Sequence, residues 1–312
     1  MAAGVLLLLA LGMGSARGAE PWDNRMSGAA TAYEEDRLAD AEVALREAIA
    51  EAERADLEGL RLAASLNALA ILVGDRGRVA EAVALGGRAL AIREKKLGPG
   101  HPDVAITLNN LAGYRALEGR QGEAEALYLR ALAIQERALG PGDVSTVATV
   151  RNLAGLYVGQ ARYLAAAPLL ARVVRAREQS LGPEDPGLAA ELNNLAEIYR
   201  LQRRASEAEP LYRRALAIQE RALGSERPEL AIVLVNLAGL CARDGRYAEA
   251  EPLYRRALAI REKVLGPAHP ALARTLEAHA AALRALGRES EAAGLDARAR
   301  RNRAGAPAPA GR

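Results

Sequence analysis

The sequence contains no phenylalanine, and only 3% of its 312 residues are aromatic. Half of the residues are nevertheless hydrophobic, so alanine and leucine must fill a core that aromatic rings usually help to fill. Small residues at this density suit closely packed helices, whereas sandwiches and barrels rely on β-branched and aromatic strands. The composition is also too apolar for a disordered chain. It therefore favours an all-α fold.

Cysteine and net charge are scarce as well. The only cysteine, Cys241, excludes an internal disulfide. The net charge is +3, and most of the excess lies between residues 284 and 312, where seven arginines face three acidic residues. The rest of the chain is close to neutral, so the sequence offers no broad face for nucleic acid.

Motifs of catalysis and metal binding are missing. The sequence has no HExxH, CxxC, phosphate-binding loop or serine nucleophile elbow. Two of the three histidines, His101 and His269, stand directly before a proline, which indicates a turn or capping role. We therefore expect a non-catalytic protein with no cofactor and no metal site.

The N-terminus resembles an export signal. The apolar run from Val5 to Met13 is about half the ~20 residues of a membrane-spanning helix, and small residues follow it up to a predicted cleavage site after Gly18. The absence of Lys and Arg from residues 1–4 argues against a signal. We expect an exported protein, periplasmic or secreted, with no membrane span after cleavage. An uncleaved anchor or a cytoplasmic protein with a wrongly assigned start is the alternative.

The body of the chain repeats with a period of 42 residues. Leu-Gly pairs end at Gly98, Gly140, Gly182, Gly224 and Gly266. Arginine recurs in the same register at Arg78, Arg120, Arg162, Arg204, Arg246 and Arg288, and we expect these arginines to be solvated charges beside a turn. Registers of this regularity predict a repeat architecture.

Each repeat contains the pattern of two helices. In residues 225–266, Pro228 lies near the start of the first helix, where its missing N–H costs nothing. One apolar stripe follows at helical spacing, formed by Leu234, Leu237, Ala238 and Cys241. Gly245 is expected to end this helix in the left-handed conformation, and a second helix begins near Ala248. Cys241 takes the place of tyrosine in other repeats, which indicates a packed thiol.

These spacings resemble the tetratricopeptide repeat, in the 42-residue subtype of kinesin light chains and many bacterial proteins. The segments HPDVAITLNNLA (101–112) and AEPLYRRALAI (250–260) carry the resemblance, which covers about residues 57–300. It implies an all-α, right-handed superhelical solenoid of about seven antiparallel helix hairpins. The alanine-rich composition is typical of a GC-rich bacterial genome.

The repeat register also divides the chain. We expect a signal peptide at 1–18, a capping hairpin at 19–56, a solenoid at 57–302 and a disordered tail at 303–312. The repeats are predicted at 57–98, 99–140, 141–182, 183–224, 225–266 and 267–302. The last repeat departs from the others at His279, which replaces leucine and is expected to be a satisfied residue of the end cap.

Asparagine is concentrated at two adjacent repeat positions. Seven of the nine asparagines lie there, although asparagine in mid-helix is about 0.5 kcal/mol less favourable than alanine. The helical wheel places Asn236 roughly opposite the apolar stripe, on a side of small and apolar neighbours such as Gly239. Helix formation does not explain this clustering, which therefore indicates a functional role for the two positions.

In the family, first helices line a concave groove, and asparagine at this motif position contacts the backbone of a bound extended peptide. The resemblance therefore implies a peptide-binding groove; its candidate residues are Asn109, Asn110, Arg151, Asn152, Asn193, Asn194, Arg200, Asn236 and Arg243. Alternatively, the amides bridge neighbouring helices, and both roles can hold together.

The predicted function is a protein–protein interaction scaffold that binds an extended, partly acidic or apolar segment of a protein partner. Binding of nucleic acid is not expected, and we expect a monomer. The alternatives are a self-assembling structural solenoid and a non-catalytic subunit of an envelope complex.

Overall fold

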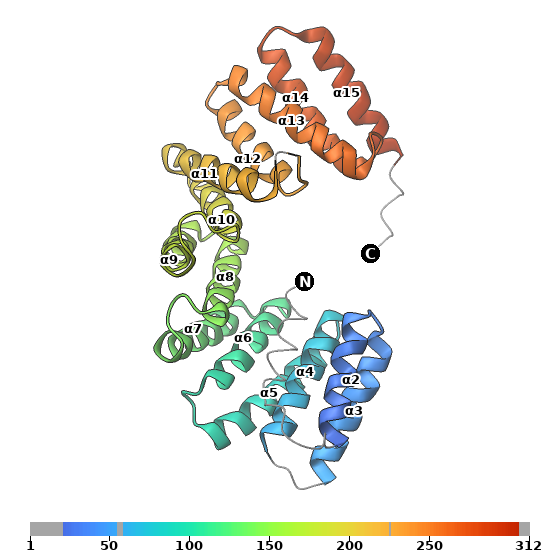
Figure 1. The fold of residues 1–312 in the computed structure, drawn as a ribbon, viewed down its shortest axis with the longest axis vertical. Coiled ribbons are helices and arrows are strands. Elements are labelled where there is room, and N and C mark those ends of the chain that lie inside the picture. The colour runs from blue at the N-terminus through green and yellow to red at the C-terminus, as the bar shows by residue number, and fades with distance from the viewer. Residues whose placement is uncertain (1–20, 55–58, 225, 306–312) are drawn as a thin grey trace. The chain divides into compact units, whose positions relative to one another are not determined.

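The computed structural model describes residues 21–54, 59–224 and 226–305, and in these residues the fold is all-α without a strand. Fourteen α-helices and one 3₁₀ turn follow one another along the described chain (Figure 1). The helices are α2 (Pro21–Glu34), α3 (Leu38–Arg54), α4 (Leu60–Asp75), α5 (Val79–Leu97), α6 (Pro102–Leu117), α7 (Gln121–Ala138), α8 (Val144–Gly159), α9 (Tyr163–Leu181), α10 (Leu188–Leu201), α11 (Ala205–Leu223), α12 (Leu230–Arg243), α13 (Tyr247–Leu265), α14 (Ala273–Ala285) and α15 (Glu289–Ala304), and the 3₁₀ turn η1 is Pro270–Leu272.

The helices confirm the predicted all-α fold class, with a helix pair in each 42-residue repeat. Gly245 has a φ of 76° after α12, in the left-handed region expected at the end of a first helix. The second helix of that repeat begins at Tyr247, one residue before the predicted start. The helix α15 extends to Ala304, so the predicted tail cannot begin at Arg303. The predicted signal at 1–18 and residues 306–312 of the tail lie outside the described residues.

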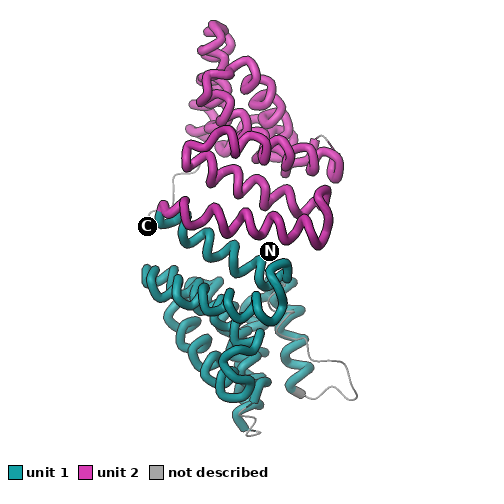
Figure 2. The backbone as a smooth tube through the Cα atoms, turned by 90° about the vertical axis from the view of Figure 1, so that its left-hand side faces the viewer, with its two compact units in different colours: residues 1–160 teal, residues 161–312 magenta. Residues whose placement is uncertain are grey.

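The chain forms two compact units, residues 1–160 and 161–312 (Figure 2). The first unit contains α2 to α8, and the second contains α9 to α15. Within each unit, every helix packs on the next one in the chain, and first helices of consecutive repeats also touch each other. No helix of the described chain is long and apolar enough to cross a membrane.

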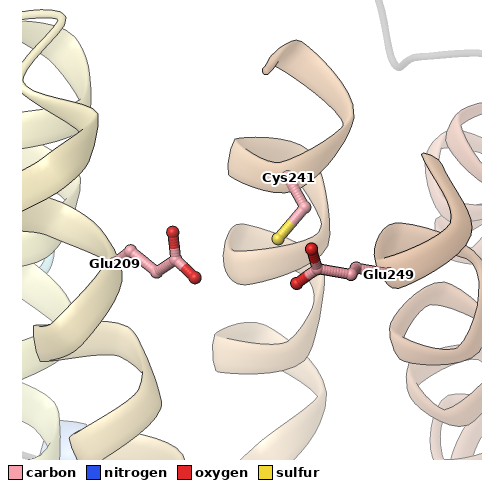
Figure 3. A group of neighbouring side chains, drawn as sticks. All are labelled: Glu209, Cys241 and Glu249. Carbon is pink, nitrogen blue, oxygen red and sulfur yellow. The ribbon is translucent and has the colours of Figure 1, made fainter. Parts of the chain in front are cut away.

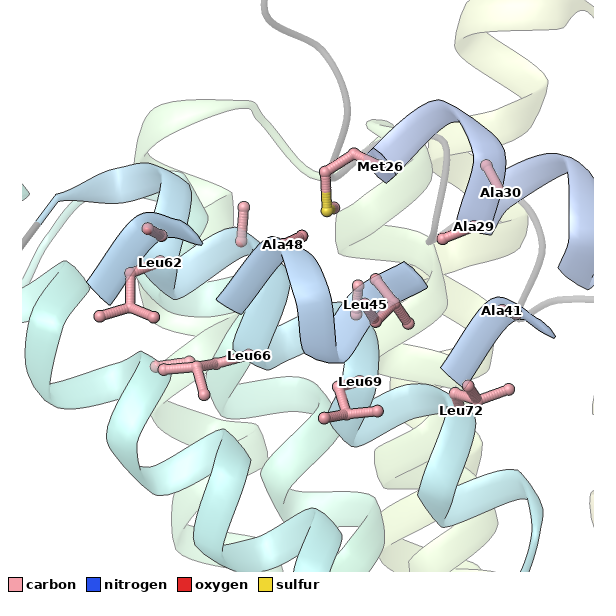
Figure 4. Close-up of a cluster of buried hydrophobic side chains, with 14 of the residues drawn as sticks. Met26, Ala29, Ala30, Ala41, Leu45, Ala48, Leu62, Leu66, Leu69 and Leu72 are labelled. Atoms are coloured by element: carbon pink, nitrogen blue, oxygen red, sulfur yellow. The ribbon is translucent and has the colours of Figure 1, made fainter. Parts of the chain in front are cut away.

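Alanine and leucine build the core of the first unit, as the composition predicts. Figure 4 shows Leu45 of α3 and leucines of α4 in one cluster with alanines of α2 and α3 and with Met26 of α2. Leu45, Leu66 and Leu69 are almost completely buried. Alanines such as Ala48 have no exposed surface, which lets the helix backbones approach closely. The packing therefore needs shape complementarity among small groups rather than large rings.

The second unit has the same construction. Leu192, Leu230 and Leu234 are fully buried, and so is Ala250 of α13. The ring of Tyr212 is the largest fully buried side chain of the unit. Tyrosine thus takes the place that phenylalanine fills in other cores, and its hydroxyl must then find a partner.

Ion pairs join the turns of successive hairpins. The registered arginines each precede the first residue of a second helix, and five of them pair with the glutamate three residues later: Arg78–Glu81, Arg120–Glu123, Arg204–Glu207, Arg246–Glu249 and Arg288–Glu291. Arg78 also reaches Glu42 of the preceding hairpin at 2.8 Å, and Arg246 reaches Glu209 at 2.6 Å. These contacts confirm that the registered arginines are turn charges.

Candidate functional site

The seven repeat asparagines lie on first helices, on a surface that we call the asparagine face of each unit. In the first unit it comprises Asn67, Asn109, Asn110 and Asn152, carried by α4, α6 and α8; in the second unit it comprises Asn193, Asn194 and Asn236, carried by α10 and α12. Asn67 and Asn109 are buried, whereas Asn152 and Asn194 are exposed. The two adjacent repeat positions therefore differ in their surroundings.

The amides form hydrogen bonds from one repeat to the previous one. In every case the side-chain amide of the second position donates to the side-chain oxygen of the first position, 43 residues earlier. The bonds are Asn110 Nδ2 to Asn67 Oδ1 at 3.3 Å, Asn152 Nδ2 to Asn109 Oδ1 at 3.0 Å, and Asn236 Nδ2 to Asn193 Oδ1 at 3.0 Å. The amides thus bridge neighbouring helices, as the alternative interpretation of the sequence held.

This bridge uses only part of each amide. An asparagine side chain has two N–H donors and an oxygen with two lone pairs. Asn152 and Asn236 each use one N–H in the bridge, and Asn152 is exposed. The remaining donor and acceptor are free to contact a ligand, so bridging and binding are chemically compatible.

Asn194 differs from the other second-position asparagines. It is exposed, and its amide makes no hydrogen bond to a described residue of its unit. The Asn194 amide therefore leaves a donor and an acceptor on the asparagine face that form no hydrogen bond within its unit.

The predicted arginines carry less free charge than the sequence suggested. Arg200 donates from Nε to Glu197 at 2.6 Å on the same helix, and Tyr212 donates its hydroxyl to the same carboxylate at 2.7 Å. Burial tends to raise the pKa of Glu197, but the bonds from Arg200 and Tyr212 outweigh it, so the pKa lies below its ordinary value. Glu197 is therefore ionised at neutral pH, and it neutralises Arg200.

Arg151 and Arg243 are both exposed. Arg243 lies 3.5 Å from the main-chain oxygen of Arg200, which is at the outer limit of a hydrogen bond. Of the three predicted arginines, Arg243 is the clearest candidate for contact with an acidic group in the second unit.

One cluster of potential metal ligands occurs in the described chain, formed by Glu209, Cys241 and Glu249 (Figure 3). Their ligand atoms lie within 4.8 Å of one another. Arg246 and Arg213 already pair with both carboxylates, at 2.6 to 3.2 Å. The thiol of Cys241 is buried, and burial raises its pKa. The two arginines neutralise the charge of the two carboxylates, and Cys241 is the packed thiol that the sequence predicts.

Two histidines confirm their predicted capping role. The Nδ1 atoms of His101 and His269 accept the main-chain N–H of Asp103 and Ala271, each at 3.1 Å. These bonds satisfy donors that a helix start leaves free.

His279 is only partly satisfied, contrary to expectation. It is buried, and its Nε2 lies 3.3 Å from Glu251 Oε1, but its Nδ1 has no partner. The ring of His279 stacks with that of Tyr254, with the two ring centroids 6.4 Å apart.

Sequence reasoning missed the tyrosine hydroxyls beside the asparagine face. The rings of Tyr128 and Tyr254 are buried. Their hydroxyls lie against Gly113 and Gly239 of the first helices. The repeated pairing of tyrosine with glycine in the sequence is the signal that could have indicated them.

The profile of the tetratricopeptide repeat family matches residues 61–137, 143–221, 188–263 and 229–304, which is most of the chain. The chain belongs to the tetratricopeptide repeat family. Members of this family generally mediate protein–protein interaction and are generally non-catalytic. No curated protein matches the sequence.

Solved structures with similar folds include tetratricopeptide repeat proteins of the kinesin light chain type. One is a Podosopora anserina protein described as a kinesin light chain with nearly identical TPR-like repeats, at 29% identity and a TM-score of 0.57, covering 65% of this chain and 97% of that one. Another is BtubC (BKLC) from P. vanneervenii, at 27% identity and a TM-score of 0.61, covering 76% of this chain and 93% of that one. The apo form of RapI shares the fold, at 14% identity and a TM-score of 0.64, covering 90% of this chain and 85% of that one.

Proposed function

We propose that the protein is a non-catalytic scaffold that binds an extended peptide segment of a partner protein on its asparagine face. The observation that carries this proposal is the exposure of Asn152 and Asn194, whose amides keep free donors and acceptors on the surface. Asparagine is unfavourable inside a helix, and Asn194 makes no bond in its own unit that would explain its presence there.

The amides can supply useful affinity. A net hydrogen bond is worth about 1 kcal/mol, so the two second-position asparagines of each unit could together contribute roughly 2 kcal/mol, or about thirtyfold in affinity. This sum is an upper bound because such contacts are rarely additive.

Contacts to a peptide backbone give little choice among sequences, so specificity needs other groups. Arg151 and Arg243 are exposed and favour an acidic group. The exposed Ala190 and Gly155 leave room for small or apolar side chains. The partner segment is therefore expected to be extended, small or apolar, and partly acidic.

The test is the double variant Asn152→Ala with Asn194→Ala, measured against a partner identified by pulldown and mass spectrometry. We expect affinity to fall at least tenfold and the free energy of unfolding to fall by less than about 1 kcal/mol. Asn24 is exposed on α2 and is not one of the seven repeat asparagines, so Asn24→Ala is the matched control and should bind like the wild type. Unchanged affinity with a large loss of stability would show that the amides only hold the repeats together.

We also propose that the protein is exported and monomeric. The apolar run before Gly18 supports export, and N-terminal sequencing of the native product should then begin at Ala19 or close by. Recovery of the intact N-terminus from the cytosol would exclude export. Light scattering after size exclusion would report any self-assembly.

A further inference from the structure

Two tyrosine hydroxyls on second helices have no partner among the described residues. Tyr128 on α7 is 5% exposed and Tyr254 on α13 is 4% exposed, and neither hydroxyl makes a hydrogen bond to another described group. The oxygens are nevertheless not sealed inside the protein. Buried phenols normally satisfy their hydroxyl, so a nearly buried ring with an open hydroxyl calls for an explanation.

A glycine on the adjacent first helix keeps each hydroxyl open. A Cβ atom built on Gly113 would lie 3.4 Å from Tyr128 Oη, and one built on Gly239 would lie 3.6 Å from Tyr254 Oη. Both glycines sit inside helices, in α6 and α12, where glycine costs about 1 kcal/mol relative to alanine. The space would accept an alanine at ordinary contact distance, so packing does not demand glycine.

The equivalent site in the repeat of α10 and α11 shows what happens without the glycine. There Glu197 takes the glycine position, and its carboxylate accepts the hydroxyl of Tyr212 at 2.7 Å. The tyrosine hydroxyl therefore points to the same place in the repeat, and it finds a protein partner wherever a side chain provides one. At Gly113 and Gly239 no side chain provides one.

The open hydroxyls lie close to the asparagine face. Gly113 comes three residues after Asn110, and Gly239 comes three residues after Asn236. Residues three apart are neighbours on one side of a helix. An asparagine amide and a tyrosine hydroxyl thus lie within one helical turn of each other in both units.

We propose that the hydroxyls of Tyr128 and Tyr254 are further contacts for a segment bound on the asparagine face of their own unit, each donating a hydrogen bond to a main-chain carbonyl through the gap left by Gly113 or Gly239. The inference rests on the proposed function and adds to it a second row of contacts. The expected occupant is the backbone of an extended peptide, because it repeats neutral acceptors along its length. Burial raises the pKa of Tyr128 to about 12, so the phenol remains a donor at physiological pH.

The experiment uses the full chain and a defined probe. A random twelve-residue peptide library displayed on phage is selected against the protein, and the strongest peptide that loses affinity for the Asn152→Ala with Asn194→Ala variant is synthesised with a fluorescein label. Fluorescence anisotropy then gives its affinity for Tyr128→Phe, Tyr254→Phe, their combination and Gly239→Ala. Tyr212→Phe is the matched control, since its hydroxyl is already used by Glu197.

The combined tyrosine variant should bind the peptide at least fivefold more weakly, about the value of one hydrogen bond, with an unchanged melting temperature. Gly239→Ala should raise the melting temperature and weaken binding, because alanine favours the helix and covers the hydroxyl. Tyr212→Phe should lower the melting temperature and leave the affinity unchanged. A purely structural role of these residues would not produce opposite changes in stability and affinity.

Two outcomes would overturn the inference, and they differ in meaning. Wild-type affinity in the combined tyrosine variant and in Gly239→Ala would refute the hydroxyl contacts while leaving the asparagine contacts standing. A library that yields no peptide dependent on Asn152 and Asn194 would refute the proposed function, and the hydroxyl contacts with it.

Discussion

The bond between Asn152 and Asn109 allows a quantitative test of the amide bridge. Asn109 is 6% exposed, and its oxygen accepts the Asn152 amide at 3.0 Å. Asn152→Ala removes this donor and leaves a buried acceptor, which costs about 1 to 1.5 kcal/mol. Alanine returns about 0.5 kcal/mol through its better helix propensity. We expect a net loss of roughly 0.5 to 1 kcal/mol in the free energy of unfolding.

Asn194→Ala provides the contrast, because Asn194 makes no bond within its unit. Only the helix propensity changes, so this variant should be neutral or about 0.5 kcal/mol more stable than the wild type. The two substitutions replace the same exposed residue type at the same repeat position. Their difference of about 1 kcal/mol therefore isolates the bridge.

A double-mutant cycle completes the test. Urea melts of Asn109→Ala, Asn152→Ala and the double variant should give a coupling energy of about 0.5 to 1.5 kcal/mol. An equal unfolding slope in all variants would show that only stability has changed. A coupling energy below about 0.3 kcal/mol, or equal effects of Asn152→Ala and Asn194→Ala, would refute the bridge as a stabilising contact.

Two further predictions concern a half-buried carboxylate and a buried histidine. The carboxylate of Glu42 accepts hydrogen bonds from Arg78 at 2.8 and 3.0 Å, and these bonds outweigh burial and lower its pKa from 4.5 to about 2. At pH 7, Glu42→Gln should therefore lower the free energy of unfolding by about 1 to 2 kcal/mol after allowance for solvent screening. Because a lowered pKa stabilises the fold only above the unfolded pKa, the gap between wild type and Glu42→Gln should shrink as the pH falls from about 5 to 2, and a constant gap in urea melts would contradict this. His279→Leu should raise the free energy of unfolding by about 1 kcal/mol, because it removes a buried unpaired nitrogen. Arg255 and Arg288 still face Glu251 at 3.3 and 3.5 Å in this variant. A less stable variant would show that the His279–Glu251 contact stabilises the fold by more than the unpaired nitrogen costs.

The local features of the fold were predictable because they depend on residues close in the chain. Gly245 has the left-handed conformation because only glycine adopts it without a steric cost. His101 and His269 cap helices because each acceptor lies two residues from its donor. Even the neutralisation of Arg200 by Glu197 was present in the sequence as a pair three residues apart. Because the repeat has a period of 42 residues, each local assignment also applies to the equivalent position of the other repeats.

The asparagine face was predictable only in part. A helical wheel shows that Asn236 points away from the apolar stripe, but it does not give the distance to the neighbouring repeat. The acceptor of Asn236 is Asn193, 43 residues earlier, and nothing local selects it. The prediction that His279 is fully satisfied was wrong for the same reason. Its contact with Glu251 spans 28 residues and depends on how two hairpins pack.

The bridge itself can strengthen ligand binding. Asn110, Asn152 and Asn236 are held by the asparagine of the previous repeat, so their amides have a fixed orientation before a ligand arrives. Ordering a free side chain on binding costs about 0.5 to 1.5 kcal/mol, and these three residues avoid much of that cost. Asn194 has no such hydrogen bond within its unit, so its binding contribution is reduced by the whole cost of ordering its side chain. The amides that stabilise the repeats are therefore the ones expected to contribute most per residue to a bound peptide, and Asn194 the least.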